Sequence, residues 1–146
     1  MGAILQRCST LIIEDWLRRA KQSSELNHLR LSDDQRTGHL GKLVDDLAGR
    51  LSLQPDVIKD SDAEYSPAAS NHGKLRFSQG YTPTMLIHES RILQVTIFGM
   101  LQKNLGSIDF SLLLPDVMTI ADEVDAQLTQ TMESYMKLTQ SPLAVA

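Results

Sequence analysis

Cysteine and aromatic residues are scarce in this chain of 146 residues, which contains one Cys, one Trp, three Tyr and three Phe. Because Cys8 stands alone, a disulfide within the chain and a cysteine-based zinc site are excluded, which fits a reducing cytoplasm. No apolar run approaches the roughly 20 residues that span a bilayer, and the amino terminus lacks a basic segment and a signal-cleavage site. We therefore expect a cytoplasmic protein without membrane insertion.

Positive charge is also scarce. The chain carries 14 Lys and Arg residues against 18 Asp and Glu residues, a net charge of −4, whereas nucleic-acid-binding proteins present a basic face. The sequence has no paired histidines at metal-ligand spacing, no Gly-rich phosphate loop and no nucleophile elbow. We therefore expect no nucleic-acid partner, no metal or other cofactor, and no catalysis by this chain alone.

Apolar residues recur at spacings of three and four in every long periodic segment, while the alternation typical of strands is absent. The pattern predicts helices over about 3–22, 33–53, 67–79, 83–104 and 116–139, a further turn at 55–58 and a loop at 61–66. Ser32 begins a capping box, and Gly80 closes its helix where glycine is favoured. We predict one all-α domain over residues 1–140, followed at 141–146 by a disordered tail or a cut linker.

The last predicted helix carries an unbroken heptad pattern over about three heptads. Such a seam keeps two helices in register across a dimer axis, but it also suits packing on the domain's own core. Both interpretations stay open, and they can apply to different halves of the helix. The seam consists of Val117, Ala121, Val124, Leu128, Thr131, Tyr135 and Leu138.

Polar residues gather at the corner between the helices predicted at 67–79 and 83–104. His72, Arg76 and Gln79 share one helical face, and Glu89 lies two turns into the next helix, within reach of Arg76 if the helices cross. Together with Tyr81 and Arg91, these residues are our candidates for a ligand site, a signal-sensing site or a hinge. A network that only fixes the corner is the simpler interpretation, and a packed polar hinge is also an element that a signal can bias.

The same corner carries a resemblance to a known family, and the similarity continues into the first and last helices. The residues that carry it are His72-Gly73, Arg76, Gln79-Gly80-Tyr81, Leu86, Glu89, Arg91, Leu93, the helix from Asp116-Val117 through Asp125 to Tyr135, and the early run Ile12-Ile13-Glu14-Asp15-Trp16-Leu17. In these positions the chain resembles the RsbR-type N-terminal domain. This domain is the non-haem globin-like sensor module of stressosome co-antagonists, and it also stands at the front of some bacterial histidine kinases.

The resemblance implies a globin-like bundle of about five to six helices without haem, with a long C-terminal helix. It also implies a homodimer whose last helix passes a signal to a C-terminal output domain or a partner signalling protein. We therefore expect a non-catalytic sensory input domain of a two-component or stressosome-type protein, whose full-length parent could carry a histidine kinase core.

Two other functions remain open at this stage. A globin-like module that binds haem or another small ligand would use His72 or His88 as the axial group, although the chain has only three Phe to line such a pocket. A plain dimerisation scaffold would need only the seam.

Overall fold

The computed structural model describes residues 1–53 and 66–140, and every regular element in these two ranges is helical. The predicted all-α class is therefore confirmed, and so is the long C-terminal helix. The helices are α1 (Gly2–Arg7), α2 (Ser9–Gln22), α3 (Asp33–Thr37), α4 (Leu40–Leu51), α5 (Pro67–Ser78), α6 (Pro83–Lys103) and α7 (Leu113–Thr139), and two short 3-10 turns, η2 (Leu105–Ser107) and η3 (Phe110–Leu112), lie between α6 and α7. The predicted turn at 55–58, most of the predicted loop at 61–66 and the predicted tail at 141–146 fall outside the described residues.

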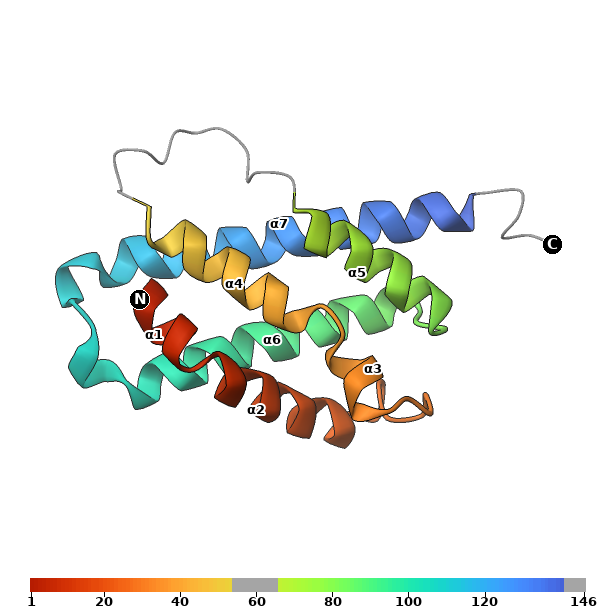
Figure 1. Cartoon of the computed structure of the whole chain (residues 1–146), viewed down its shortest axis with the longest axis horizontal. Helices are drawn as coiled ribbons and strands as arrows, with labels where there is room; N and C mark the ends of the chain where they lie inside the picture. The colour runs from red at the N-terminus through yellow and green to blue at the C-terminus, as the bar shows by residue number, and fades with distance from the viewer. Residues whose placement is uncertain (54–65, 141–146) are drawn as a thin grey trace.

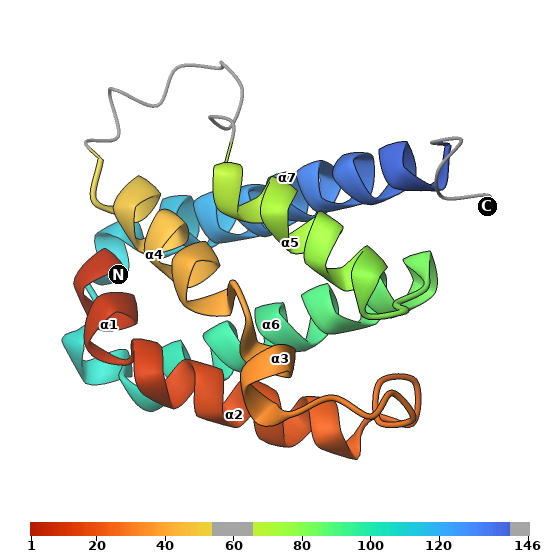
Figure 2. The same cartoon turned by 45° about the vertical axis from the view of Figure 1, so that its right-hand side comes forward.

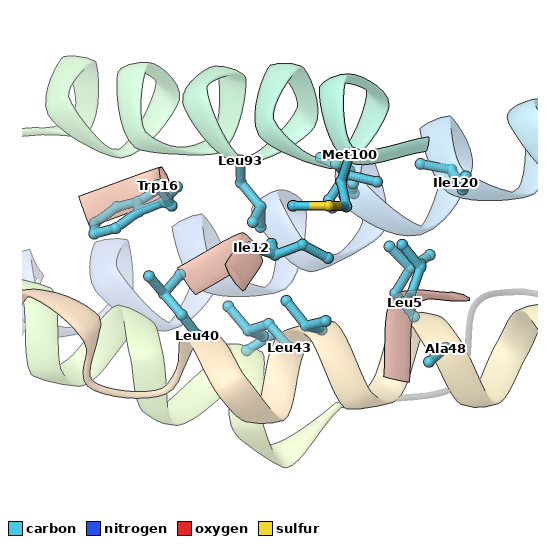
Figure 3. Packing of buried hydrophobic residues seen from close by; sticks show 14 of the residues in the cluster. Leu5, Ile12, Trp16, Leu40, Leu43, Ala48, Leu93, Met100 and Ile120 are labelled. Atoms are coloured by element: carbon cyan, nitrogen blue, oxygen red, sulfur yellow. The ribbon is translucent and has the colours of Figure 1, made fainter. Parts of the chain in front are cut away.

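The bundle is built around α6 and α7, the two longest helices (Figures 1 and 2). Helix α5 packs along the C-terminal half of α7, α2 packs on α6, and α1 packs on α4. Figure 3 shows the apolar side chains that α1, α2, α4, α6 and α7 send into the shared core, with Trp16 fully buried among them. None of the described helices is both long enough and apolar enough to cross a bilayer.

Two of the predicted helices were wrong in extent, because each is divided into two helices in the structure. The segment predicted at 3–22 bends at Cys8, because α1 turns to pack against the end of α4. A Cβ atom on Gly2 would lie 2.6 Å from the Ser52 hydroxyl oxygen. The segment predicted at 33–53 breaks at Gly38, whose φ of 24° favours glycine. A Cβ atom there would lie 2.8 Å from the side chain of Leu75 on α5.

Three predicted helix ends carry the caps that the sequence indicates, at Ser32, Ser66 and Gly80. The Ser32 hydroxyl accepts a hydrogen bond from the Gln35 amide at 3.1 Å, and the Gln35 side chain accepts one from the Ser32 amide at 2.8 Å. The Ser66 hydroxyl caps α5, and Gly80 adopts a φ of 88° at the corner after it. Helix α7 begins earlier than predicted, so that Pro115 lies in its first turn, where proline is tolerated.

Helices α5 and α7 meet backbone to backbone at Gly73. Any Cβ atom on Gly73 would overlap the Ser134 hydroxyl and the Thr131 carbonyl. Two hydroxyl groups on α7 donate hydrogen bonds to α5 carbonyl groups across this contact, from Thr131 to Ala69 at 3.1 Å and from Ser134 to Ser70 at 2.7 Å. Small residues and inter-helix hydrogen bonds therefore hold the C-terminal half of α7 in a fixed place beside α5.

Candidate functional site

The candidate site is centred on the carboxylate of Glu89, which α6 places between two side chains of α5. His72 Nε2 lies 2.6 Å from Glu89 Oε1, and Arg76 Nε lies 3.0 Å from Glu89 Oε2. The three residues are 3%, 0% and 4% exposed in the order His72, Arg76, Glu89. The spacing of four places His72 and Arg76 on one face of α5, so both can reach the same carboxylate. The ion pair confirms the predicted contact between Arg76 and Glu89.

The guanidinium group of Arg76 also holds the end of α3. Its Nη1 donates to the Gln35 carbonyl at 3.1 Å and to the Gln79 side chain at 2.6 Å, and its Nη2 donates to the Arg36 carbonyl. The Gln79 amide nitrogen donates to the same Gln35 carbonyl at 3.0 Å. The cation thus meets carbonyl groups in the last turns of α3, the negative end of a helix, while its Nε faces a carboxylate.

Tyr81 connects this cluster to α7. Its ring lies against the Arg76 guanidinium, 4.4 Å from the guanidinium carbon to the ring centroid. Its main-chain carbonyl accepts a hydrogen bond from the hydroxyl of Tyr135 on α7. The ring of Tyr135 packs edge-on against Phe77 of α5 at 5.3 Å. A displacement of Arg76 would therefore reach α7 through a single intervening residue.

The electrostatics of the cluster keep Glu89 ionised. Burial raises the pKa of Glu89, but the positive charges of His72 and Arg76, together with hydrogen bonds from His72 and Tyr81, outweigh that effect, so the pKa of this carboxyl lies below its ordinary value. Burial and the charge of Glu89 raise the pKa of Tyr81 well above its ordinary value, so this phenol stays neutral. A carboxylate paired with a guanidinium is the arrangement that a buried charge requires.

Two histidine rings lie next to each other behind the carboxylate. Because ionised Glu89 only accepts hydrogen bonds, the Nε2 of His72 must carry a hydrogen. The other ring nitrogen of His72, Nδ1, is buried and has no hydrogen-bond partner among the described residues. The His39 ring meets the His72 ring edge-on at 6.4 Å. Burial first, and then the charges of His72, Lys42 and Arg76, lower the pKa of His39.

A cavity of about 30 Å³ lies beside the cluster, between α4, α5, α6 and α7. Leucine side chains and Val124 form most of its wall. Five polar residues also line it: His72, Glu89, Ser90, Gln127 and Thr131. No group of three or more His, Cys, Asp or Glu side chains within residues 1–53 and 66–140 is placed to hold a metal ion.

Arg91 is the one residue of the predicted corner that the structure places elsewhere. It lies on the exposed side of α6, in a surface groove that Arg19 and His88 also line. Two residues along a helix correspond to about 200° around its axis, so Arg91 faces away from the core when Glu89 faces inward. The cluster therefore contains five of the six predicted residues.

The predicted seam on α7 is divided between the core and the surface. Val124, Thr131 and Tyr135 are buried against the chain's own core, and the Thr131 hydroxyl binds α5. The remaining seam residues are half-buried: Val117, Ala121, Leu128 and Leu138. The middle of the seam thus belongs to the domain core.

Sequence reasoning missed three participants in the site. Two are the carbonyl groups of Gln35 and Arg36, and a main-chain carbonyl carries no residue-specific signal. The third is Trp16, whose buried indole donates to the Glu89 carbonyl at 3.2 Å. A buried indole usually needs an acceptor, so the single Trp in an apolar stripe could have pointed to a polar partner, although not to which one.

No protein-family model, no curated protein and no solved structure matches this chain.

Proposed function

We propose that this chain is a non-catalytic sensory input domain, in which the buried cluster around Glu89 controls the position of the C-terminal helix. The observation that carries the proposal is the continuous contact from Glu89 through Arg76 and Tyr81 to Tyr135 on α7. The cluster brings together five side chains from α5, α6 and the corner between them, yet it presents no nucleophile paired with a base. Its chemistry suits the positioning of helices better than the turnover of a substrate.

The physical basis of such control is the cost of a buried charge. Arg76 is fully buried, and its charge is balanced by one carboxylate and a few carbonyl groups. Any event that draws Glu89 away or neutralises it leaves the guanidinium underpaired, at a cost of a few kcal/mol. Arg76 would then move toward water, taking Tyr81 and the carbonyl held by Tyr135 with it. Packed cores respond to such stress by switching between discrete arrangements.

The resemblance to RsbR-type N-terminal domains supports the same role and extends it. On that resemblance, we propose a cytoplasmic homodimer that works with a C-terminal output domain or a partner signalling protein of the histidine kinase or stressosome type. The non-haem globin-like character of the bundle belongs to the same proposal.

A haem-binding role fits the site less well. The Nε2 of His72, the atom that an axial ligand would offer, is bound to Glu89 at 2.6 Å. His88 lies at the surface groove rather than beside the internal cavity. A Soret band after addition of haem would favour this alternative, and its absence would favour the non-haem proposal.

The proposed dimer has a candidate surface at the amino-terminal end of α7. Large apolar side chains stand exposed there and on the turn before it: Phe110 at 65%, Leu112 at 41%, Leu114 at 69% and Met118 at 64%. Exposed apolar patches of this kind often mark protein contacts. The same patch favours a dimerisation scaffold as the second candidate function.

Light scattering tests the dimer directly. We expect the wild-type mass to be that of a dimer, and Met118→Asp to yield a folded monomer because a charge would be buried at the contact. Leu11→Asp is the matched control, since Leu11 is 54% exposed on α2, and this variant should stay dimeric. A wild-type monomer would contradict the dimer, and a dimeric Met118→Asp variant would place the contact elsewhere.

Hydrogen exchange tests the link between the cluster and α7. We expect Glu89→Gln to speed amide exchange at residues 131–139 more than at residues 113–122 of the same helix. In a Tyr135→Phe background this selective effect should shrink, because the hydrogen bond to Tyr81 is gone. Equal acceleration along the whole of α7 would indicate general destabilisation and would count against the proposed route.

A further inference from the structure

We propose that the surface groove between α2 and α6 binds a small organic anion, whose charged group pairs with Arg91 and whose apolar body covers Ile92 and Val95. Helices α2 and α6 lie side by side (Figure 2), and the groove between them measures about 370 Å³. This volume lies within the range of sites that hold small organic ligands. The groove is lined by Arg19, Gln22, Ser23, His88, Arg91, Ile92 and Val95.

The sign of the ligand follows from positive charge that the groove leaves uncompensated. None of the described residues that line it is acidic, although acidic residues outnumber basic ones in the chain by 18 to 14. Arg91 is exposed and forms no ion pair or hydrogen bond with any described residue. Arg19 pairs with Asp15 at 3.0 Å, but Arg18 pairs with the same carboxylate at 2.6 Å. One negative charge therefore serves two guanidinium groups, and a bound anion would supply another.

Two carboxylates lie near the groove without lining it, and they indicate where the anion binds. Asp15 engages Arg19, and Glu25 lies within electrostatic range of His88. Arg91 follows His88 by about one turn of α6 and has no carboxylate of its own among the described residues. A guanidinium group offers a planar pair of donors that matches a carboxylate or a phosphate. The charged group of the ligand therefore belongs at Arg91.

The apolar surface beside Arg91 favours a ligand that also has an apolar body. Val95 follows Arg91 by one turn of α6 and is 54% exposed, and Ile92 is half-buried beside it. An ion pair that stands in water contributes little by itself, whereas covering exposed apolar surface adds favourable free energy. The ligand class is therefore a carboxylate or phosphate that carries an aromatic or aliphatic group.

Binding in this groove does not depend on the proposed sensory function. The groove lies on the outer side of α6, whereas Glu89 is buried. The same pair of helices is joined by Trp16, whose indole on α2 donates to the Glu89 carbonyl. Only the further step, that a ligand held between α2 and α6 alters the cluster through this contact, rests on the proposed function.

NMR titration at constant ionic strength tests the ligand class with benzoate, phenyl phosphate, benzamide and acetate. We expect benzoate or phenyl phosphate to shift the amide signals of residues 19–23 and 88–95 saturably, and the tighter of the two identifies the preferred anionic group. Benzamide lacks the charge and acetate lacks the ring, so each should bind at least about fivefold more weakly. If neither aryl anion saturates these signals, the site is overturned. Benzamide or acetate binding as tightly as benzoate would overturn the ligand class.

Replacement of Arg91 by Gln tests the residue that pairs with the anion. This change removes a charge that has no partner among the described residues, so the fold should be unaffected, and the aryl anion should bind about fivefold more weakly. Arg7→Gln is the matched control, because Arg7 is exposed at the end of α1 and does not line the groove. Its affinity should equal that of the wild type.

An unchanged affinity in Arg91→Gln, or an equal loss in Arg7→Gln, would overturn the pairing with Arg91, the second because it would indicate only the net charge of the protein. Neither measurement depends on whether Glu89→Gln alters α7. The anion site and the proposed sensory function therefore fail independently.

Discussion

The hydroxyl of Tyr135, four residues before the end of α7, donates its hydrogen to the main-chain carbonyl of Tyr81 at the α5–α6 corner. The two residues are 54 positions apart in the chain, and both are at least nine-tenths buried. This bond is therefore a tertiary link between the corner that holds Arg76 and the helix that we propose transmits a signal.

Replacing Tyr135 by Phe should lower the free energy of unfolding by about 1–3 kcal/mol, because the Tyr81 carbonyl loses its buried donor while the ring stays against Phe77. Urea denaturation measures this change. Thr129→Val is the control, since the Thr129 hydroxyl only binds a carbonyl of its own helix on the exposed side, and it should change stability by less than about 0.5 kcal/mol. Equal losses in both variants would show that the link to Tyr81 contributes nothing of its own.

Replacing Glu89 by Gln should cost about 3–5 kcal/mol, because it leaves the buried charge of Arg76 without its carboxylate. Asp15→Asn removes a carboxylate from a more exposed pair with Arg18 and Arg19 and should cost less than about 1 kcal/mol. Chemical denaturation of both variants compares the two losses. If Glu89→Gln were as mild as the control, Arg76 would have found other compensation and the proposed switching cost would be lost.

Replacing Gly73 by Ala should destabilise the protein by about 1–3 kcal/mol or more, because the new methyl group overlaps the Thr131 carbonyl and the Ser134 hydroxyl. Gly49→Ala offers a sharp contrast, since nothing lies within 4 Å of its added methyl group on α4. That variant should gain about 0.5–1 kcal/mol from helix propensity alone. The Tm of Gly73→Ala should therefore fall below that of the wild type, and the Tm of Gly49→Ala should rise above it. A raised Tm for Gly73→Ala would contradict the close contact between α5 and α7.

The pH dependence of stability should report the ionisation of Glu89. Its pKa in the folded protein lies below the ordinary value of 4.5, so the unfolded chain binds this proton more readily. The stabilisation from Glu89 is therefore complete above about pH 4.5 and is lost as the pH falls through the folded-state pKa.

Urea unfolding of wild type and Glu89→Gln between pH 7 and pH 3 isolates this contribution, because other acidic groups with lowered pKa values act equally in both proteins. We expect the difference in unfolding free energy to shrink as the pH falls below about 4.5. A difference that stays constant over this range would mean that folding does not lower the pKa of Glu89.

Much of the architecture could be predicted because local signals determine helices. The capping box at Ser32, the hydroxyl cap at Ser66 and the glycine at position 80 each satisfy main-chain groups within a few residues. The breaks at Cys8 and Gly38 could not be predicted in the same way. They are set by α1 packing on α4 and by Leu75 approaching Gly38, which are contacts between segments distant in sequence.

The candidate site was predictable to the extent that its residues share a helical face. His72, Arg76 and Gln79 follow from spacing, and Glu89 follows from the crossing of two adjacent helices. Arg91 was assigned by proximity in sequence alone, and helical rotation places it on the opposite side of α6 from Glu89. The carbonyl groups that bind Arg76, the indole of Trp16 and the internal cavity depend on how α2, α3 and α7 pack, which no local pattern encodes.

The contact at Gly73 also makes α7 a lever with unequal arms. From Thr131, where the backbones touch, α7 extends back to Leu113 over about 27 Å and forward to Thr139 over about 12 Å, at the rise of an α-helix. A small tilt about this fulcrum would displace the amino-terminal end about twice as far as the carboxyl-terminal end. The exposed apolar side chains of Leu114 and Met118 lie on the longer, amino-terminal arm. A small displacement of α7 at the Tyr81 corner would therefore become a larger displacement at the surface where we place the second subunit.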